Sequence, residues 1–250
     1  MSHDLTFDRI REASDRIRGH VVRTPVLERR VGQATLLIKP EGLQSIGAFK
    51  LRGAINKMAQ LPPDCPGVVA HSSGNHAQAV ARAAKLLGIP ATVVMPNNAP
   101  PLKRRRTEAD GAHVIVVGPD SDERRDRARS IAASEGLVAV EPYDDVDIAA
   151  GQGTAALELL EDCGTIDALY APVSGGGIMA GCAIATRAMA PNATIIAVEP
   201  AAKDSLHRSF KAGTRVSVPP PETIADGLRV RVPGEMTWPH LRDHVDRTML

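Results

Sequence analysis

The chain has 250 residues, enough for one or two domains with a substantial core. Its 30 basic and 29 acidic residues nearly cancel, so the composition gives no indication of a nucleic-acid or membrane-surface partner. The three cysteines are far apart and show no metal-ligand spacing, which predicts reduced thiols in a cytoplasmic protein. The charged start of the chain lacks a signal-peptide core, and no apolar run reaches membrane-spanning length.

Short apolar runs alternate with helical patterns along the chain. Helices are expected at 1–20, from Lys50 onward, and at 75–88, 100–110, 121–136, 153–164 and 178–190. Strands are expected at 34–39, 67–72, 91–96, 112–118, 166–173 and 194–200, and the proline cluster at 218–223 indicates a loop. Gly88 is expected to close one helix and Ser121 to cap another.

The predicted strands are apolar throughout rather than at alternate positions. This pattern is typical of parallel strands whose sheet is covered on both faces. Together with the alternation of strand and helix, it predicts an α/β protein with doubly wound sheets.

A basic run, KRRR, occupies residues 103–106 within a predicted helix. It is followed by Glu108 and Asp110, which favours a solvated helix face over a phosphate-binding patch.

The stretch SIGAFKLRGA places Lys50 where a helix is expected to begin, although helix starts favour anions. One interpretation is an exposed lysine whose stem lies along apolar neighbours. The other is an amine placed for covalent chemistry. The residue pattern alone leaves both open.

A polar turn, HSSGNH (71–76), lies between a predicted strand and a predicted helix. Because ligands of open α/β sheets bind at the carboxyl ends of strands, and helix N-termini favour anions, this turn is a candidate site for a carboxylate or a phosphate. Alternatively, Ser72, Ser73 and Asn75 simply cap the helix.

A glycine-rich loop, SGGG (174–177), also joins a predicted strand to a predicted helix. Consecutive glycines let several backbone N–H groups approach a phosphate. The same loop fits a dinucleotide fingerprint, since Gly175, Gly177 and Ala180 match G-x-G-x-x-G/A and Glu199 ends the next strand. An NAD-binding oxidoreductase is therefore a second interpretation. A third polar segment, TIADGLRV (223–230), indicates only a turn.

Six motifs in order resemble the fold-type II pyridoxal-phosphate enzymes, specifically the serine/threonine dehydratase and serine racemase group. They are GAFKLRGA, SSGNHAQAVA, YDDVDIAAGQGTAALELLE, PVSGGGIMAG, AVEP and TIADGLRV, within a resemblance that runs from about Ile17 to the end of the chain. The resemblance implies a two-domain fold like that of the tryptophan synthase β subunit. It implies a large cofactor-binding domain of residues 1–66 and 145–250, and a small domain of residues 67–144 that closes over substrate. It also implies a homodimer or higher homo-oligomer.

The resemblance assigns roles to particular residues. The implied cofactor-binding residues are Phe49, Lys50, Asn75, Ser174, Gly175, Gly176, Gly177 and Gly227. The implied substrate-binding residues are Ser72, Ser73, Gly74, Asn75 and His76. Lys50 would form the Schiff base with pyridoxal 5'-phosphate and act as the catalytic base, with Phe49 beneath the cofactor. Asn75 would bond the ring's 3-hydroxyl oxygen, the glycine-rich loop would hold the phosphate, and Asp226 and Gly227 would line the cofactor edge.

The activity implied by the resemblance is that of an ammonia-lyase. Its products would be pyruvate or 2-oxobutyrate plus ammonia, from L-serine or L-threonine, with 3-hydroxyaspartate as a third candidate substrate. In racemases of this group a serine on the opposite cofactor face is a second acid/base, and Ser73 matches it. Serine racemase is therefore an alternative activity.

Two departures from the family pattern stand out. Many relatives bind a divalent cation with a glutamate matching Glu199 and an acidic residue six positions later, where this chain has Ser205, beside Lys203 and Asp204. A divalent cation is therefore not expected, and Glu199 is the only candidate ligand. Relatives also continue past the equivalent of Val245 through further α/β units, so we expect a chain shortened at its C-terminus. An inactive pyridoxal-phosphate-binding remnant is a third alternative.

Overall fold

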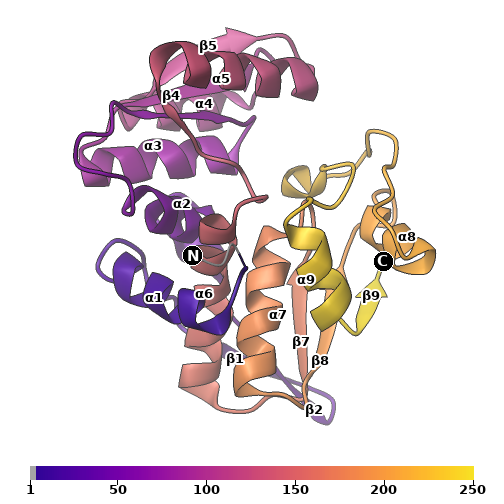
Figure 1. Ribbon diagram of the computed structural model, residues 1–250. Coiled ribbons are helices and arrows are strands. Elements are labelled where there is room, and N and C mark those ends of the chain that lie inside the picture. Colours follow the sequence, from indigo (N-terminus) through magenta and orange to yellow (C-terminus); the bar gives the residue numbers. More distant parts are fainter. Residues whose placement is uncertain (1–3) are drawn as a thin grey trace. The chain divides into compact units, whose positions relative to one another are not determined.

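The computed structural model describes residues 4–250 and divides into two compact units (Figure 1). Unit 1 comprises Met1–Asp15, described from residue 4, Arg23–Glu41 and Tyr143–Leu250. Unit 2 comprises Arg16–Val22 and Gly42–Pro142. This division differs from the expected domains mainly in residues 42–66, which belong to unit 2 because helix α2 packs on α3. A small domain of residues 67–144 that closes over substrate stays a prediction.

Unit 2 is built on a four-stranded parallel sheet with the strand order β5–β4–β3–β6. The strands are β3 (Val68–His71), β4 (Ala91–Pro96), β5 (His113–Val117) and β6 (Val138–Ala139). The helices are α2 (Lys50–Met58), α3 (Asn75–Leu87), α4 (Pro101–Ala109) and α5 (Ser121–Glu135).

Both faces of this sheet are covered. On β4, Val93 and Met95 pack with Ala77 of α3, whereas Val94 between them packs with Ile131 of α5. Successive strand residues point to opposite faces, so α3 and α5 lie on opposite sides of the sheet. The continuous apolar strands of this unit therefore reflect burial on both faces, and the doubly wound α/β prediction is confirmed.

Unit 1 contains a three-stranded parallel sheet, β7–β8–β9, and an antiparallel hairpin, β1–β2. The strands are β1 (Leu27–Val31), β2 (Ala34–Ile38), β7 (Ala168–Pro172), β8 (Thr194–Val198) and β9 (Arg247–Met249). Its helices are α6 (Val146–Cys163), α7 (Gly177–Met189), α8 (Ser205–Ala212) and α9 (Thr237–His244), with a 3-10 turn η2 (Asp226–Leu228). Helix α1 (Phe7–Ile17) and the 3-10 turn η1 (Glu41–Leu43) cross the division between the units.

Helices α6 and α7 pack closely through small residues in unit 1. A Cβ built on Gly153 of α6 would lie 2.8 Å from the carbonyl oxygen of Gly181 of α7. Alanines such as Ala149, Ala180 and Ala183 are fully buried in the same core. The aromatic-poor composition is thus compatible with a dense core, because short side chains let the two backbones approach.

Several element boundaries differ from the expected ones. Helix α6 begins at Val146 rather than 153, because the Asp145 carboxylate caps it by accepting from the N–H groups of Asp147 and Ile148 at 2.8 and 3.0 Å. The expected cap at Ser121 is wrong: Asp120 caps α5. Gly88 ends α3 in the left-handed conformation, as expected. None of the helices within residues 4–250 combines the length and apolar character needed to cross a bilayer.

Candidate functional site

Lys50 is the first residue of α2 and is partly buried in unit 2. Its Nζ donates a hydrogen bond to the carbonyl oxygen of Pro142 at 2.5 Å and lies 5.4 Å from the centre of the Phe49 ring. Loss of hydration lowers the pKa of the amine to about 8. The exposed-lysine interpretation is therefore wrong, and the side chain has the features of a reactive amine.

The serine–asparagine turn, residues 72–76, joins β3 to α3 in the same unit. The N-cap of α3 is Gly74, which makes no side-chain cap, and the only hydroxyl engaged nearby is that of Ser72, which accepts from Gly74 N–H at 3.1 Å. Within residues 4–250 the Ser73 hydroxyl and the Asn75 amide make no hydrogen bond. Simple capping does not account for these two side chains, which are free to bind a ligand.

His76 is a buried neutral side chain beside Lys50. Its Nε2 donates to the carbonyl oxygen of Val140 at 2.9 Å. Burial first, and then the charge of Lys50, lower the pKa of His76 to about 3. His76 is thus uncharged at neutral pH, and its contact with Val140 makes it a support for the turn rather than a cationic ligand.

Lys103 lies beside the serine–asparagine turn, a position that the sequence does not predict. A Cβ built on Gly74 would lie 3.2 Å from Lys103 Nζ, so the ammonium reaches the serine–asparagine turn from α4. The next three residues, Arg104, Arg105 and Arg106, are exposed as expected for a solvated face. Lys103 is partly buried because α3 and α4 are packed together, and a charge run by itself gives no sign of that packing.

The glycine loop, Ser174–Gly177, lies in unit 1 between β7 and α7. Gly176 has a φ of +106°, and a Cβ there would meet Thr237 Oγ1 at 2.7 Å. A Cβ on Gly177 would lie 2.9 Å from the carbonyl oxygen of Tyr143. Close packing therefore requires glycine at these positions, in addition to the left-handed conformation at Gly176.

The N–H groups of the glycine loop fit a phosphate. Within the described part of the chain, no hydrogen bond has the amide of Ser174, Gly175, Gly176 or Gly177 as its donor. These groups stand at the N-terminus of the 13-residue helix α7. Unsatisfied amides combined with the positive end of a helix are the chemistry that binds phosphate groups, so the loop can hold the phosphate of pyridoxal phosphate.

Two further expected site residues lie in unit 1. Gly227 belongs to the 3-10 turn η2, is exposed, and has nothing within 4 Å of a built Cβ. Glu199, directly after β8, is buried and bonded to Lys203. Among residues 4–250 no group of three His, Cys, Asp or Glu side chains could hold a metal ion. The residues present do not fit a divalent cation at Glu199.

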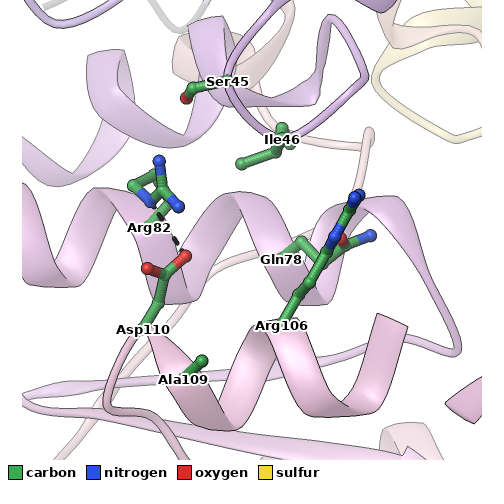
Figure 2. Close-up of a pocket in the computed structure, with 7 residues that line it drawn as sticks. All are labelled: Ser45, Ile46, Gln78, Arg82, Arg106, Ala109 and Asp110. Carbon is green, nitrogen blue, oxygen red and sulfur yellow. Dashed lines mark hydrogen bonds and ion pairs between the residues drawn. The ribbon is translucent and has the colours of Figure 1, made fainter. Parts of the chain in front are cut away.

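A pocket in unit 2 is separate from the expected site residues (Figure 2). It is lined by Ser45, Ile46, Gln78, Arg82, Arg106, Ala109 and Asp110. Arg82 Nε donates to Asp110 at 2.8 Å, which neutralises one of the two arginines. No residue expected to bind cofactor or substrate lines this pocket.

The expected residues therefore form two groups. Phe49, Lys50 and the serine–asparagine turn belong to unit 2, whereas the glycine loop, Gly227 and Glu199 belong to unit 1. Within unit 2 the amine, the turn and the charge of Lys103 are the parts that could bind and deprotonate an amino acid. Within unit 1 the free amides are the part that could bind a phosphate.

Comparison with known proteins identifies relatives over nearly the whole chain. The family model described as "Pyridoxal-phosphate dependent enzyme" matches residues 17–250. The chain is 44% identical over 247 residues to L-threo-3-hydroxyaspartate ammonia-lyase of Saccharomyces cerevisiae, covering 96% of this chain and 76% of that protein. It is 42% identical over 247 residues to serine racemase of Schizosaccharomyces pombe, again covering 96% and 76%.

Solved structures agree with these relatives. The threonine deaminase of T.th. superposes with a TM-score of 0.92 at 41% identity, covering 98% of this chain and 82% of that one. Maize serine racemase also gives a TM-score of 0.92 at 41% identity, covering 99% and 76%. These matches favour pyridoxal phosphate over a dinucleotide as the ligand of the glycine loop. The chain belongs to the pyridoxal-phosphate-dependent enzymes of fold type II, in the group that contains the ammonia-lyases of hydroxy amino acids and the serine racemases.

Proposed function

We propose that the protein is an ammonia-lyase for small β-hydroxy amino acids, releasing ammonia and a 2-oxo acid. The candidate substrates are L-serine, L-threonine and L-threo-3-hydroxyaspartate, which are suggested by the names of its relatives. The observation that carries the proposal is the partly buried Lys50 amine, with its pKa lowered to about 8, at the start of α2. An amine with this pKa is partly neutral near pH 7 and can serve as a base.

The residues of the chain divide the work as follows. Pyridoxal phosphate, when bound, supplies an electron sink for the negative charge that develops at the substrate Cα. Lys50 holds the cofactor and its Nζ takes the Cα proton. The serine–asparagine turn at the start of α3 binds the substrate carboxylate, with Lys103 adding a positive charge beside Gly74. Asn75 and Phe49 would contact the cofactor ring, and Gly227 would line its edge.

The glycine loop binds the phosphate group of the cofactor. Its four free N–H groups and the helix α7 dipole support this assignment, and Ser174 Oγ is held in place by accepting from Val230 N–H at 3.2 Å. Loss of a β-hydroxyl from the substrate needs a proton donor near the phosphate, and we expect that proton to come from a group at this loop.

Borohydride reduction followed by peptide mapping tests the proposal directly. Purified protein is expected to be yellow, absorbing at about 415 nm, and reduction is expected to leave a pyridoxyl group on Lys50. Lys50→Ala is expected to be colourless, with Lys57→Ala, another lysine of α2, as the matched control. Reduced protein with no adduct at Lys50 would refute the proposal.

Measuring 2-oxo acid release from each of the three candidate substrates distinguishes an active ammonia-lyase from an inactive pyridoxal-phosphate-binding protein. Colour without any 2-oxo acid would favour the pyridoxal-phosphate-binding remnant. The chain covers about three quarters of the length of its first relatives.

Serine racemase is the second candidate activity, and one observation favours it. The Ser73 hydroxyl is exposed and uses no hydrogen bond within residues 4–250, so it is available as a second acid/base. If it has that role, Ser73→Ala is expected to lose D-serine formation and to keep pyruvate release from L-serine. Equal loss of both products would argue against a role in racemisation.

We also infer that the protein is a cytoplasmic homo-oligomer. Its three cysteines, Cys65, Cys163 and Cys182, are free, which supports a reducing compartment. Four exposed apolar side chains of the β1–β2 hairpin support association with further copies of the chain; they are Leu27, Val31, Leu36 and Ile38.

A further inference from the structure

Unit 1 buries an ion pair between Lys203 and Glu199. Of the two, only Glu199 was among the expected binding residues. The side chains of Lys203 and Glu199 are both 0% exposed, and Lys203 Nζ donates to Glu199 Oε1. Burial lowers the pKa of Lys203, and the charge of Glu199 offsets only part of that lowering. Enclosing two charges in a protein interior is unfavourable unless each has further partners.

Each partner of the pair has such further contacts. Glu199 accepts from the N–H groups of Leu206 at 3.1 Å and His207 at 2.9 Å, in the first turn of α8. Lys203 Nζ also donates to the carbonyl oxygen of Ser174 at 3.1 Å. The ammonium thus lies between the Glu199 carboxylate and the first residue of the glycine loop.

The contact with Ser174 orients the loop. The residues described contain no cis peptide bond, so each N–H points away from the preceding carbonyl. Since the Ser174 carbonyl faces Lys203, the Gly175 N–H faces the opposite way. The Gly175 carbonyl is held by Gly234 N–H at 3.0 Å and by Thr237 Oγ1 at 2.6 Å, which orients the Gly176 N–H in turn. Two successive carbonyls are anchored, and the two N–H groups that follow them remain free.

A divalent cation cannot replace the ammonium with the present side chains. The charge of Asp204 also acts on Lys203, but both Asp204 oxygens accept from Arg208 Nε at 2.8 Å, which leaves Glu199 as the carboxylate available to a cation. Ser205, whose Oγ lies 3.5 Å from Glu199 Oε1, offers only a hydroxyl. Hard divalent cations require several carboxylate and carbonyl oxygens.

We propose that the Lys203 ammonium serves as a built-in cation in place of a bound divalent metal, and that it positions the glycine loop for the cofactor phosphate. Lys203 is a positioning residue, because it acts through the Ser174 carbonyl and touches no reacting atom. The proposal rests on the glycine loop being the phosphate site of the proposed function. It makes cofactor binding independent of added metal.

Binding of pyridoxal phosphate and of pyridoxal, which lacks the phosphate, tests this role without any turnover. Lys203→Met is expected to weaken binding of pyridoxal phosphate about tenfold or more, the size typical of one lost charge-assisted hydrogen bond, and to leave pyridoxal binding unchanged. Lys211→Met, an exposed lysine of α8, is the control and is expected to change neither. Lys203→Met that keeps the wild-type preference for pyridoxal phosphate would overturn the proposal. Wild-type protein without that preference would instead refute the phosphate role of the glycine loop.

Lys203→Met leaves the buried Glu199 carboxylate without its counter-charge, which can destabilise the fold. A second variant in which neither side chain is charged is therefore needed. Glu199→Gln combined with Lys203→Met removes both charges and is expected to fold while showing the same loss of phosphate preference. Trp238 fluorescence reports folding, since its ring packs edge-on against Phe210 of α8 with 5.8 Å between ring centres. A folded double variant with wild-type preference would also overturn the proposal.

Metal dependence supplies a second, independent measurement. The cofactor affinity and melting temperature of wild-type protein are expected to be the same in EDTA and in millimolar Mg²⁺ or Ca²⁺. The double variant Lys203→Ala, Ser205→Asp places a second carboxylate beside Glu199, and its cofactor affinity is expected to rise when Mg²⁺ is added. Loss of wild-type affinity in EDTA, restored by Mg²⁺, would contradict a built-in cation.

Discussion

Lys103 shows how one side chain can acquire a role that its sequence neighbours lack. It stands first in a run of four basic residues, of which only Lys103 packs against Gly74 of the serine–asparagine turn. The run predicts a charged helix face, and three of its members are exposed accordingly. The exception follows from the packing of α3 against α4, which no local pattern encodes.

Replacing Lys103 by methionine removes the charge and keeps most of the side-chain volume. We expect KM for the amino-acid substrate to rise about tenfold, since one charge-assisted hydrogen bond is typically worth about 1.5–3 kcal/mol, with a smaller change in kcat. Steady-state 2-oxo acid release measures both parameters. Lys85→Met, an exposed lysine of the same unit, is the matched control. An unchanged KM in Lys103→Met would exclude a contact between the Lys103 ammonium and the substrate carboxylate.

His76 makes the stability of unit 2 sensitive to acid. Its pKa is about 3 in the fold and about 6.5 in an unfolded chain. Between these pH values the unfolded chain binds a proton that the folded chain does not. The contribution of neutral His76 to the free energy of unfolding is therefore complete above about pH 6.5 and is lost as the pH falls toward about 3.

We accordingly expect the gap in urea midpoint between wild type and His76→Gln to narrow from about pH 7 to about pH 4.5. Far-ultraviolet circular dichroism measures the two midpoints. His113→Gln, an exposed histidine of β5, is expected to show no such trend. A gap that stays constant with pH would show that folding does not shift the pKa of His76.

The helix pair α6–α7 illustrates what can be predicted about elements. The alanine- and glycine-rich sequence of both segments predicts helices, and both form, but α6 starts seven residues earlier than expected. Asp145 supplies the cap that explains the difference. Strands β3, β4 and β5 of unit 2 were recognisable from their continuous apolar runs, but the two-residue strand β6 was not recognised. Strands β1 and β9 were not, because the first is exposed at every position and the second is only three residues long.

The contact between α6 and α7 should tolerate no added side chain. A Cβ on Gly181 would lie 2.7 Å from Gly153 N and still closer to the Ala149 carbonyl oxygen, so Gly181→Ala forces the backbones apart. We expect a loss of about 1–3 kcal/mol in unfolding free energy, as is typical of overpacked cores. Urea unfolding followed by Trp238 fluorescence measures this loss. Gly42→Ala, where a Cβ meets nothing within 4 Å, is expected to be near neutral.

The β1–β2 hairpin bears on the assembly of the whole molecule. Its register places Leu27 opposite Ile38 and Val31 opposite Ala34, so these side chains and Leu36 share one face. All four large members are between 39% and 56% exposed. Arg29, paired with Leu36, lies on the same face, so the four apolar side chains surround one exposed arginine. Several exposed apolar side chains on one face of a hairpin are typical of a surface that another protein covers.

If a second copy of the chain covers this face, the protein is expected to sediment at twice its 26.5 kDa mass or more. Val31→Glu together with Leu36→Glu is expected to shift it toward monomer, because the interface would then bury unpaired carboxylates. Glu28→Lys, on the opposite face of the same strand, is the control. A wild-type protein that sediments as a monomer at micromolar concentration would rule out this association.

At the level of the whole chain, the family and the class of chemistry could be predicted from six motifs, whereas the division into units could not. The motifs are local, but the assignment of residues 42–66 to unit 2 depends on α2 packing against α3. That Glu199 would lack the partners of a metal site was foreseeable from Ser205 and Lys203. The proposal that the Lys203 ammonium takes the place of a metal depends on its hydrogen bond to the Ser174 carbonyl, which only the structure shows.

The uneven distribution of aromatic side chains has a practical consequence for spectroscopy. Trp238 and both tyrosines, Tyr143 and Tyr170, belong to unit 1, and Phe49 is the only aromatic residue in unit 2. Intrinsic emission and near-ultraviolet dichroism will therefore register melting of one half of the polypeptide and remain silent about the half that carries the reactive amine. If the two units unfold at different denaturant concentrations, tryptophan emission is expected to show one transition. Peptide-bond absorption, which reports both units, is then expected to show two.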